Sequence, residues 1–139
     1  MMSIEMFIGM FIFQYVFSSY IMTDQTQNIT NSLGKVYMCT IMGLFMVILG
    51  LMMNPKFNLP HFLFFALLLS LTILMYKTQF GIGDKDYLRE MIEHHSMALL
   101  TSKNILDKTK NPAVANFATR ILVGQEKEID DMRYLLKSI

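Results

Sequence analysis

Charged residues are nearly absent from the first half of this 139-residue chain, and this limits most strongly what the chain can fold into. Residues 6–76 contain only Asp24, Lys35 and Lys56 as charged residues, whereas later positions are charged every few residues. Three long apolar runs fill this region, at residues 6–22, 33–53 and 60–76. A helix that crosses the hydrocarbon core of a membrane needs about 20 mostly apolar residues, within a range of about 17–25. The sequence therefore predicts an N-terminal anchor, residues 1–78, with three transmembrane helices in a lipid bilayer.

Short polar segments separate the three apolar runs. The first separator, TDQTQNITNS at residues 23–32, is polar apart from Ile29. The second, NPKFNLP at residues 54–60, contains two prolines that suit a tight turn. As an alternative, the first run would be a cleaved signal peptide, but no Lys or Arg precedes it and no small-residue cleavage site follows it. We therefore expect the first helix to be retained.

Two amphipathic helices are predicted after the anchor, in a domain of residues 84–139. Asp84 suits the N-cap of a helix over residues 85–109, and Asn111 suits the cap of a second helix over residues 112–137 that begins with proline. Each helix has an apolar stripe with the i, i+3, i+4 spacing that is typical of one buried face. The first stripe is Leu88, Met91, Ile92, His95, Ala98, Leu99, Ser102, Ile105 and Leu106. The second is Val114, Phe117, Ala118, Ile121, Leu122, Gln125, Glu128, Ile129, Met132, Leu135 and Leu136.

Polar residues interrupt both stripes at the same level of the predicted antiparallel hairpin. His95, with His94 at its edge, interrupts the first stripe, and Gln125 and Glu128 interrupt the second. An unpaired buried polar group costs about 1–3 kcal/mol, so we expect these side chains to contact one another, water or an ion. Two such helices form a thin core, so we also expect a homo-oligomer in which two hairpins form a four-helix bundle.

The residues around the paired histidines are potential metal ligands. Met91 lies one helical turn before both histidines, and the hairpin brings Met132 of the second helix near them. Histidine combined with thioether sulfur favours Cu(I), whereas histidine combined with carboxylate favours Zn(II) or Cu(II). The alternative is a metal-free seam in which the histidines are hydrogen-bonded to Glu128 and Gln125.

Several function classes lack the residues that they need. A di-iron site in a helical bundle needs Glu-x-x-His pairs on two helices, but Met91 stands three residues before His94 and the second helix has no histidine. Ser96 follows His95 directly and so points about 100° away from it on a helix, which does not suit a nucleophile and its base. A net charge of +1 gives no basic surface for nucleic acid. We therefore expect a binding protein and not an enzyme.

Two segments, MIEHHSMALLTSKNI and NPAVANFATRILVGQEKEIDDMRYLL, together resemble the DUF305 family of small ferritin-like helical domains. The family pattern is an M-I-x-H-H-x-x-A core followed, after a short loop, by a Q-x-x-E-I-x-x-M stretch. This chain matches the pattern at Met91, Ile92, His94, His95, Ala98, Gln125, Glu128, Ile129 and Met132. The resemblance covers about residues 84–138, and the preceding runs resemble a bacterial subgroup that joins a three-helix membrane anchor to this domain.

The resemblance implies a ferritin-like fold, placement outside the cytoplasm, and copper or silver binding through His and Met. We expect the ligands to be His94 and His95, with soft partners Met91 and Met132, and with Gln125 and Glu128 supporting or replacing them. Two positions depart from the family. Glu93 stands where proline usually precedes the paired histidines, and Thr101-Ser102 stands where Met-Ala is common, which removes one soft ligand.

The sequence thus predicts an all-α, membrane-anchored metal-binding protein, with copper as its ion and zinc as the alternative. Its expected role is metal sequestration, sensing or handover to a metal-handling partner. The competing hypothesis is a metal-free helical interaction module tethered to the membrane, or a subunit of a larger membrane complex. Basic residues beside the runs favour a cytoplasmic C-terminal domain, whereas the family favours an extracytoplasmic one, which is the placement we expect.

Overall fold

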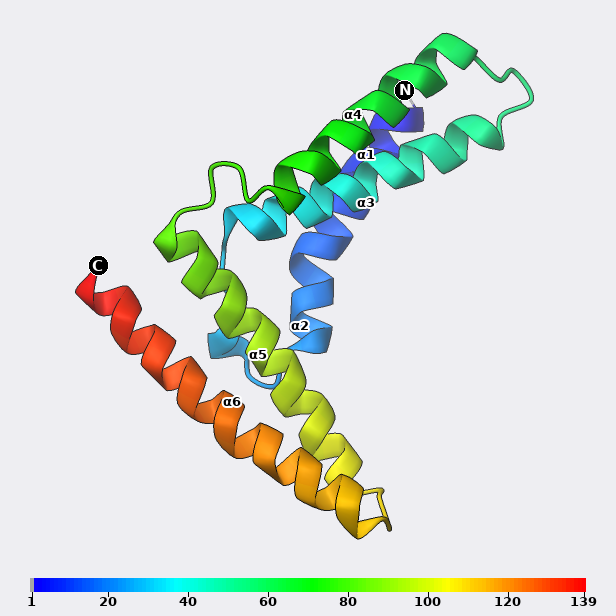
Figure 1. Ribbon diagram of the computed structural model, residues 1–139. Coiled ribbons are helices and arrows are strands. Elements are labelled where there is room, and N and C mark those ends of the chain that lie inside the picture. Colours follow the sequence, from blue (N-terminus) through cyan, green and yellow to red (C-terminus); the bar gives the residue numbers. More distant parts are fainter. Residues whose placement is uncertain (1) are drawn as a thin grey trace. The chain divides into compact units, whose positions relative to one another are not determined.

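The computed structural model describes residues 2–139, with side chains from Ile4 onward, so that Met1 of the predicted anchor lies outside the described residues. The described chain is all-α and contains no β-strand, as the sequence predicts. In chain order the elements are α1 (Met2–Ile12), a π-helical stretch (Phe13–Ser18), α2 (Ser19–Met22), a 3-10 turn (Thr26–Asn28), α3 (Leu33–Met52), α4 (Leu59–Lys77), α5 (Asp84–Leu106) and α6 (Pro112–Ser138) (Figure 1). These elements form two compact units.

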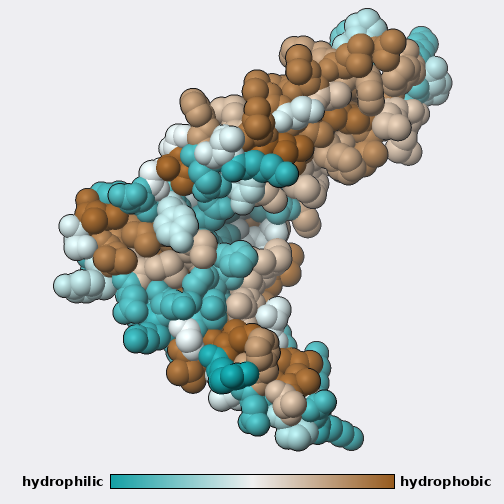
Figure 2. Space-filling view, in the orientation of Figure 1, coloured by the Kyte–Doolittle hydropathy of each residue, from teal (hydrophilic) through white to brown (hydrophobic). Residues whose placement is uncertain are grey.

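Three helical segments are long and apolar enough to cross a membrane. They are Ile4–Met22, Leu33–Met52 and Leu59–Lys77, which match the predicted runs to within two residues at each end. Few of their side chains are buried inside the chain, and their surface in Figure 2 is predominantly hydrophobic. Such a surface suits lipid, because a helix crossing a bilayer satisfies its backbone hydrogen bonds internally and presents apolar side chains outward.

The first unit comprises the residues up to Ser18 together with Leu33–Ile82, and within it α3 packs against both α1 and α4. Its buried apolar side chains are Cys39, Leu44, Val47 and Ile48, all on α3. Gly43 permits a close approach of α1, because a Cβ atom there would lie 2.7 Å from the Phe7 ring and 3.2 Å from the Phe7 carbonyl oxygen. Small residues at such contacts let helices in membranes bring their backbones together.

The second unit comprises Ser19–Ser32 and Gly83–Ile139. Helices α5 and α6 pack side by side as an antiparallel hairpin (Figure 1). Its hydrophobic core consists of Leu88, Ile92, Leu99, Ile129 and Met132. Each of these residues lies on one of the two predicted stripes, so the helical periodicity correctly indicated the faces that meet.

The helix starts follow local capping chemistry. The Asn111 side chain accepts a hydrogen bond from the Ala113 N–H at 2.9 Å, and proline follows at the first position of α6, as predicted. Asp84 is not the N-cap of α5, because Gly83 occupies that position and Asp84 is the first helical residue. An acidic side chain in the first turn still stabilises the helix, because it interacts favourably with the positive end of the helix dipole.

The predicted stripe of α6 is only partly buried. Ala118 is buried, whereas Val114, Phe117 and Leu135 are 40%, 57% and 46% exposed. Within the unit α6 packs mainly on one helix, α5, so the ends of its stripe are only partly covered there.

A further difference concerns residues 19–32, which we call the strap. The sequence predicts that these residues belong to the anchor and that most of them form a polar loop within it. The structure groups them with α5 and α6 in the second unit.

Candidate functional site

His95 and Glu128 meet across the seam between α5 and α6. The His95 Nδ1 atom lies 3.1 Å from Glu128 Oε2, and the His95 side chain is 14% exposed against 54% for Glu128. The two atoms are close enough for an ion pair but do not form a hydrogen bond, and the buried Nδ1 atom has no hydrogen-bond partner within the described part of the chain. A buried polar atom in this condition is unusual, since most such atoms are hydrogen-bonded. The seam therefore contains a buried imidazole nitrogen that faces a carboxylate without an aligned hydrogen bond.

The other predicted polar ligands lie at different distances from this contact. Gln125 Nε2 donates a hydrogen bond to Glu128 Oε2 at 3.2 Å, so Gln125, Glu128 and His95 form a connected group as the sequence suggests. His94 is exposed, and its ring centroid lies 6.2 Å from that of His95 with the planes at 60°. The two histidines therefore have different environments, one in the seam and one on the surface.

Met91 and Met132 both belong to the apolar cluster of the hairpin, Met132 in its buried core and Met91 partly buried against it. Met91 precedes His95 by four residues and Met132 follows Glu128 by four, so each lies one turn along its own helix. Because α5 and α6 are antiparallel, one turn back along α5 and one turn forward along α6 lead in the same direction along the hairpin. The structure thus places two thioethers on the same side of the His95–Glu128 contact.

Burial lowers the pKa of His95 below the ordinary value of 6.5; the Glu128 carboxylate partly opposes this effect and the neighbouring His94 adds to it. A lowered pKa keeps the imidazole neutral at pH 7, and the neutral ring is the form that binds metal ions.

Among the described residues, no three side chains of His, Cys, Asp or Glu gather closely enough to hold a metal ion together. The seam supplies two such donors, His95 and Glu128. A third protein donor at this level must therefore be an amide or a thioether, and the chain offers Gln125, Met91 and Met132.

The opposite surface of the same turn of α5 binds the strap, and Glu93 is its first contact. The Glu93 carboxylate accepts hydrogen bonds from the Ser19 hydroxyl and from the Thr30 N–H, the latter at 3.0 Å. The Thr30 hydroxyl donates a further hydrogen bond to the Arg89 carbonyl oxygen at 2.6 Å. Glu93, which replaces the usual proline of the resembled pattern, therefore connects α5 to both ends of the strap.

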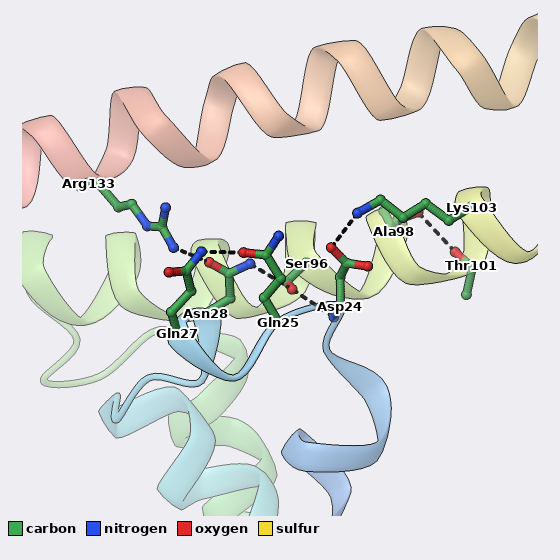
Figure 3. A network of polar contacts seen from close by, with 9 residues as sticks. All are labelled: Asp24, Gln25, Gln27, Asn28, Ser96, Ala98, Thr101, Lys103 and Arg133. Atoms are coloured by element: carbon green, nitrogen blue, oxygen red, sulfur yellow. Dashed lines mark hydrogen bonds and ion pairs between the residues drawn. The ribbon is translucent and has the colours of Figure 1, made fainter.

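Ser96 holds the middle of the strap. Its hydroxyl oxygen accepts hydrogen bonds from the Asp24 N–H and from Asn28 Nδ2, each at 3.0 Å (Figure 3). Ser96 is fully buried and Asn28 is 3% exposed. Since both groups are removed from water, these hydrogen bonds satisfy donors that would otherwise be left unpaired.

Two cations complete the docking surface, one from each helix. Arg133 of α6 donates to Asn28 Oδ1 at 2.6 Å, and Lys103 of α5 pairs with Asp24 Oδ2 at 2.6 Å (Figure 3). The Asn28 side chain thus bridges Ser96 and Arg133, and so connects the two helices of the hairpin through the strap.

Sequence reasoning missed these strap contacts. Ser96 was considered only as a nucleophile, and the loop offered no periodicity that could predict its docking.

Comparison with known proteins places the second unit in a family. The model of the domain of unknown function DUF305 matches residues 77–138. An uncharacterized protein of Acanthamoeba polyphaga mimivirus is 31% identical over 138 residues, which are 97% of this chain and 91% of the viral protein, so the similarity extends over both units. No solved structure matches the chain. The matched region carries the paired histidines, the seam and most of the strap-binding surface. The chain therefore belongs to the DUF305 family.

Proposed function

We propose that the protein is a membrane-anchored metal-binding protein that holds a soft metal ion, Cu(I), at the α5–α6 seam. The observation that carries this proposal is the buried His95 Nδ1 atom, which has no hydrogen-bond partner among the described residues. Met91 lies one turn before His95 on α5, and Met132 lies one turn after Glu128 on α6. The role is sequestration, sensing or handover of the ion, without catalysis.

The donor set favours Cu(I) over Zn(II). Thioether and imidazole ligands together suit Cu(I), whereas structural zinc sites have four Cys, His or carboxylate ligands. The described residues include no group of three such zinc-type donors. In the proposed site His95 and the two methionines, Met91 and Met132, bind the ion and His94 joins them. Glu128, which lies 3.1 Å from His95 Nδ1, and Gln125 are supporting or alternative ligands.

The three apolar helices are proposed to cross a lipid bilayer, with the second unit outside the cytoplasm and with a ferritin-like arrangement. The strap contacts support the three crossings. Residues 23–32 of the strap follow the first candidate span, Ile4–Met22, and must lie on the same side of the membrane as the hairpin to touch it. The two candidate spans between them, Leu33–Met52 and Leu59–Lys77, return the chain to that side.

The test is a Cu(I) titration of the full-length protein in detergent micelles against a competing chelator, with Zn(II) in parallel. The double variant Met91→Leu/Met132→Leu keeps the apolar volume and removes both sulfurs, and Met97→Leu on the flank of α5 is its matched control. We expect stoichiometric Cu(I) binding that the double variant weakens at least tenfold and the control leaves unchanged. Equal affinities in all three proteins, or preference for Zn(II), would contradict the proposal.

A second candidate is a metal-free module that forms a homo-oligomer, and exposed apolar residues of α6 favour it. Val114, Phe117 and Leu135 lie at helical spacing on one stripe and are 40%, 57% and 46% exposed. A second hairpin covering this stripe would form a four-helix bundle, with His95 and Glu128 fixing the register. The measurement is the mass of the full-length protein in micelles: a dimer that His95→Ala dissociates without any metal supports this candidate, and a monomer contradicts it.

A further inference from the structure

One side of α6 carries two large apolar residues that the rest of the unit leaves largely uncovered. Phe117 and Leu135 are 57% and 46% exposed. At about 100° per residue, these two side chains lie on the same side of the helix axis, and Gly124 lies within about 20° of both. Arg120 and Asp131 lie within about 60° of that direction. We call these five residues the outer face of α6.

Gly124 lies in the middle of the outer face. Glycine inside a helix destabilises it relative to alanine. The packing of the chain itself does not require a glycine here, because a Cβ atom at Gly124 would have no heavy atom within 4 Å. A glycine in open space on an exposed helix face permits the backbone of another helix to approach closely.

The two ends of the outer face carry opposite charges. Near the start of α6, the Arg120 guanidinium lies 5.6 Å from the centroid of the Phe117 ring. Near the end of the helix, Asp131 accompanies Leu135. Neither Arg120 nor Asp131 belongs to an ion pair within the described part of the chain. Each end therefore offers one apolar side chain and one charge, and the signs of the two charges are opposite.

This arrangement is complementary to its own reversed copy. Phe117 and Leu135 lie nine residues before and after Glu126, and Arg120 and Asp131 lie six residues before it and five after it. A second α6 that runs antiparallel with Glu126 at the same level therefore places Phe117 opposite the partner's Leu135 and Arg120 opposite the partner's Asp131. A two-fold axis produces each contact twice. A parallel pair would instead place each charge opposite itself, which is repulsive.

We propose that the outer face of α6 binds a second copy of this chain, with the two α6 helices antiparallel about a two-fold axis near Glu126 and with Gly124 permitting their close approach. This inference rests on the homo-oligomer of the second candidate function and specifies its contact surface and orientation. It requires no metal ion. Two copies in one bilayer can pair in this way, because a two-fold axis along the membrane normal makes helices that lie across it antiparallel.

The experiment is disulfide cross-linking of the full-length protein in micelles, in a Cys39→Ala background that removes the native thiol. Chains with Phe117→Cys and chains with Leu135→Cys carry different tags and are co-expressed. We expect a disulfide between the two kinds of chain and none in either variant expressed alone. In an antiparallel pair, two copies of the same residue lie about 27 Å apart along the axis, whereas a disulfide joins Cα atoms no more than about 7 Å apart.

Glu126→Cys is the matched control for this experiment. Residue 126 lies at the level of the two-fold axis, but about 180° around the helix from Phe117. We expect no disulfide between two copies of this variant, because their thiols lie on the far sides of the paired helices.

A charge exchange tests the same surface without cysteines. Arg120→Glu places a carboxylate opposite the partner's Asp131 at two symmetric contacts, and we expect the dissociation constant of the dimer to rise at least about fivefold. Adding Asp131→Arg restores opposite charges at both contacts, so the double variant should dimerise as the wild type does. A charge that acted only within its own chain would not show this rescue.

The outcomes distinguish this interface from the homo-oligomer itself. A dimer in which Phe117→Cys or Leu135→Cys cross-links with itself, or in which the mixed chains fail to cross-link, would overturn the antiparallel interface and leave the second candidate standing. A monomer would overturn both. Failure of Asp131→Arg to rescue the Arg120→Glu dimer would also refute the proposed contacts.

Discussion

Replacement of Ser96 by alanine is the sharpest single test of the strap. The hydroxyl accepts two hydrogen bonds at 3.0 Å, from Asp24 N–H and from Asn28 Nδ2, in a fully buried position. At about 1 kcal/mol for each net hydrogen bond, the substitution destabilises the docked strap by about 2 kcal/mol. Since 1.4 kcal/mol corresponds to a factor of ten, the opening equilibrium of the strap increases about 30-fold.

The assay is native-state hydrogen exchange, because it reports local opening of the strap while the rest of the protein stays folded. The Thr30 N–H is the reporter, since its hydrogen bond to Glu93 remains in the variant and breaks only when the strap opens. Ser102→Ala is the matched control, because Ser102 is also buried on α5 but makes none of the hydrogen bonds reported for the strap. The prediction is wrong if the exchange rates of the Thr30 N–H in the two variants lie within about threefold of each other.

Three further predictions concern other parts of the molecule. Gly43→Val weakens the packing of α1 on α3 by about 1–3 kcal/mol, because even a Cβ atom meets the Phe7 ring at 2.7 Å. Gly9→Ala is the control that leaves this packing unchanged, because a Cβ atom there has nothing within 4 Å. Thermal denaturation in micelles compares the two variants, and equal midpoints would contradict the packing. Because the folded pKa of His95 lies below its unfolded value of 6.5, the unfolded chain binds the proton first, so the second unit keeps its stability above pH 6.5 and loses it as pH falls from there toward the folded pKa. Exchange protection of α5 and α6 measured against pH tests this loss, and His95→Gln should flatten the profile. Lys103→Gln destabilises the docked strap by less than about 1 kcal/mol, because the Lys103 side chain is 46% exposed and exposed ion pairs are weak. Hydrogen exchange of the strap measures this loss, and a loss as large as that of Ser96→Ala would contradict the prediction.

Local chemistry made much of the fold predictable. Apolar length located the three candidate spans to within two residues, and the Asn111-Pro112 pair located the start of α6. Both signals are read from neighbouring residues, so they do not depend on tertiary structure. The stripe of α6 was less informative at its ends, since burial of Val114 and Phe117 depends on a partner that periodicity does not specify.

The two faces of α5 differ in how far the sequence predicted them. His95, Gln125 and Glu128 were expected to meet, because polar residues on facing apolar stripes are costly unless they interact. Glu93 was noted only as a departure from the family pattern. Its partner Thr30 lies 63 residues away, and no local rule connects a loop between two candidate spans with a helix after the third candidate span.

An X-ray absorption spectrum of the full-length protein loaded with one equivalent of Cu(I) tests the metal site most directly. The proposed site predicts a mixed shell of nitrogen and sulfur scatterers, in which Met91→Leu/Met132→Leu removes the sulfur and leaves the imidazole nitrogen. A shell of nitrogen and oxygen alone, unchanged by the double variant, would contradict a site built from His95 and the methionines.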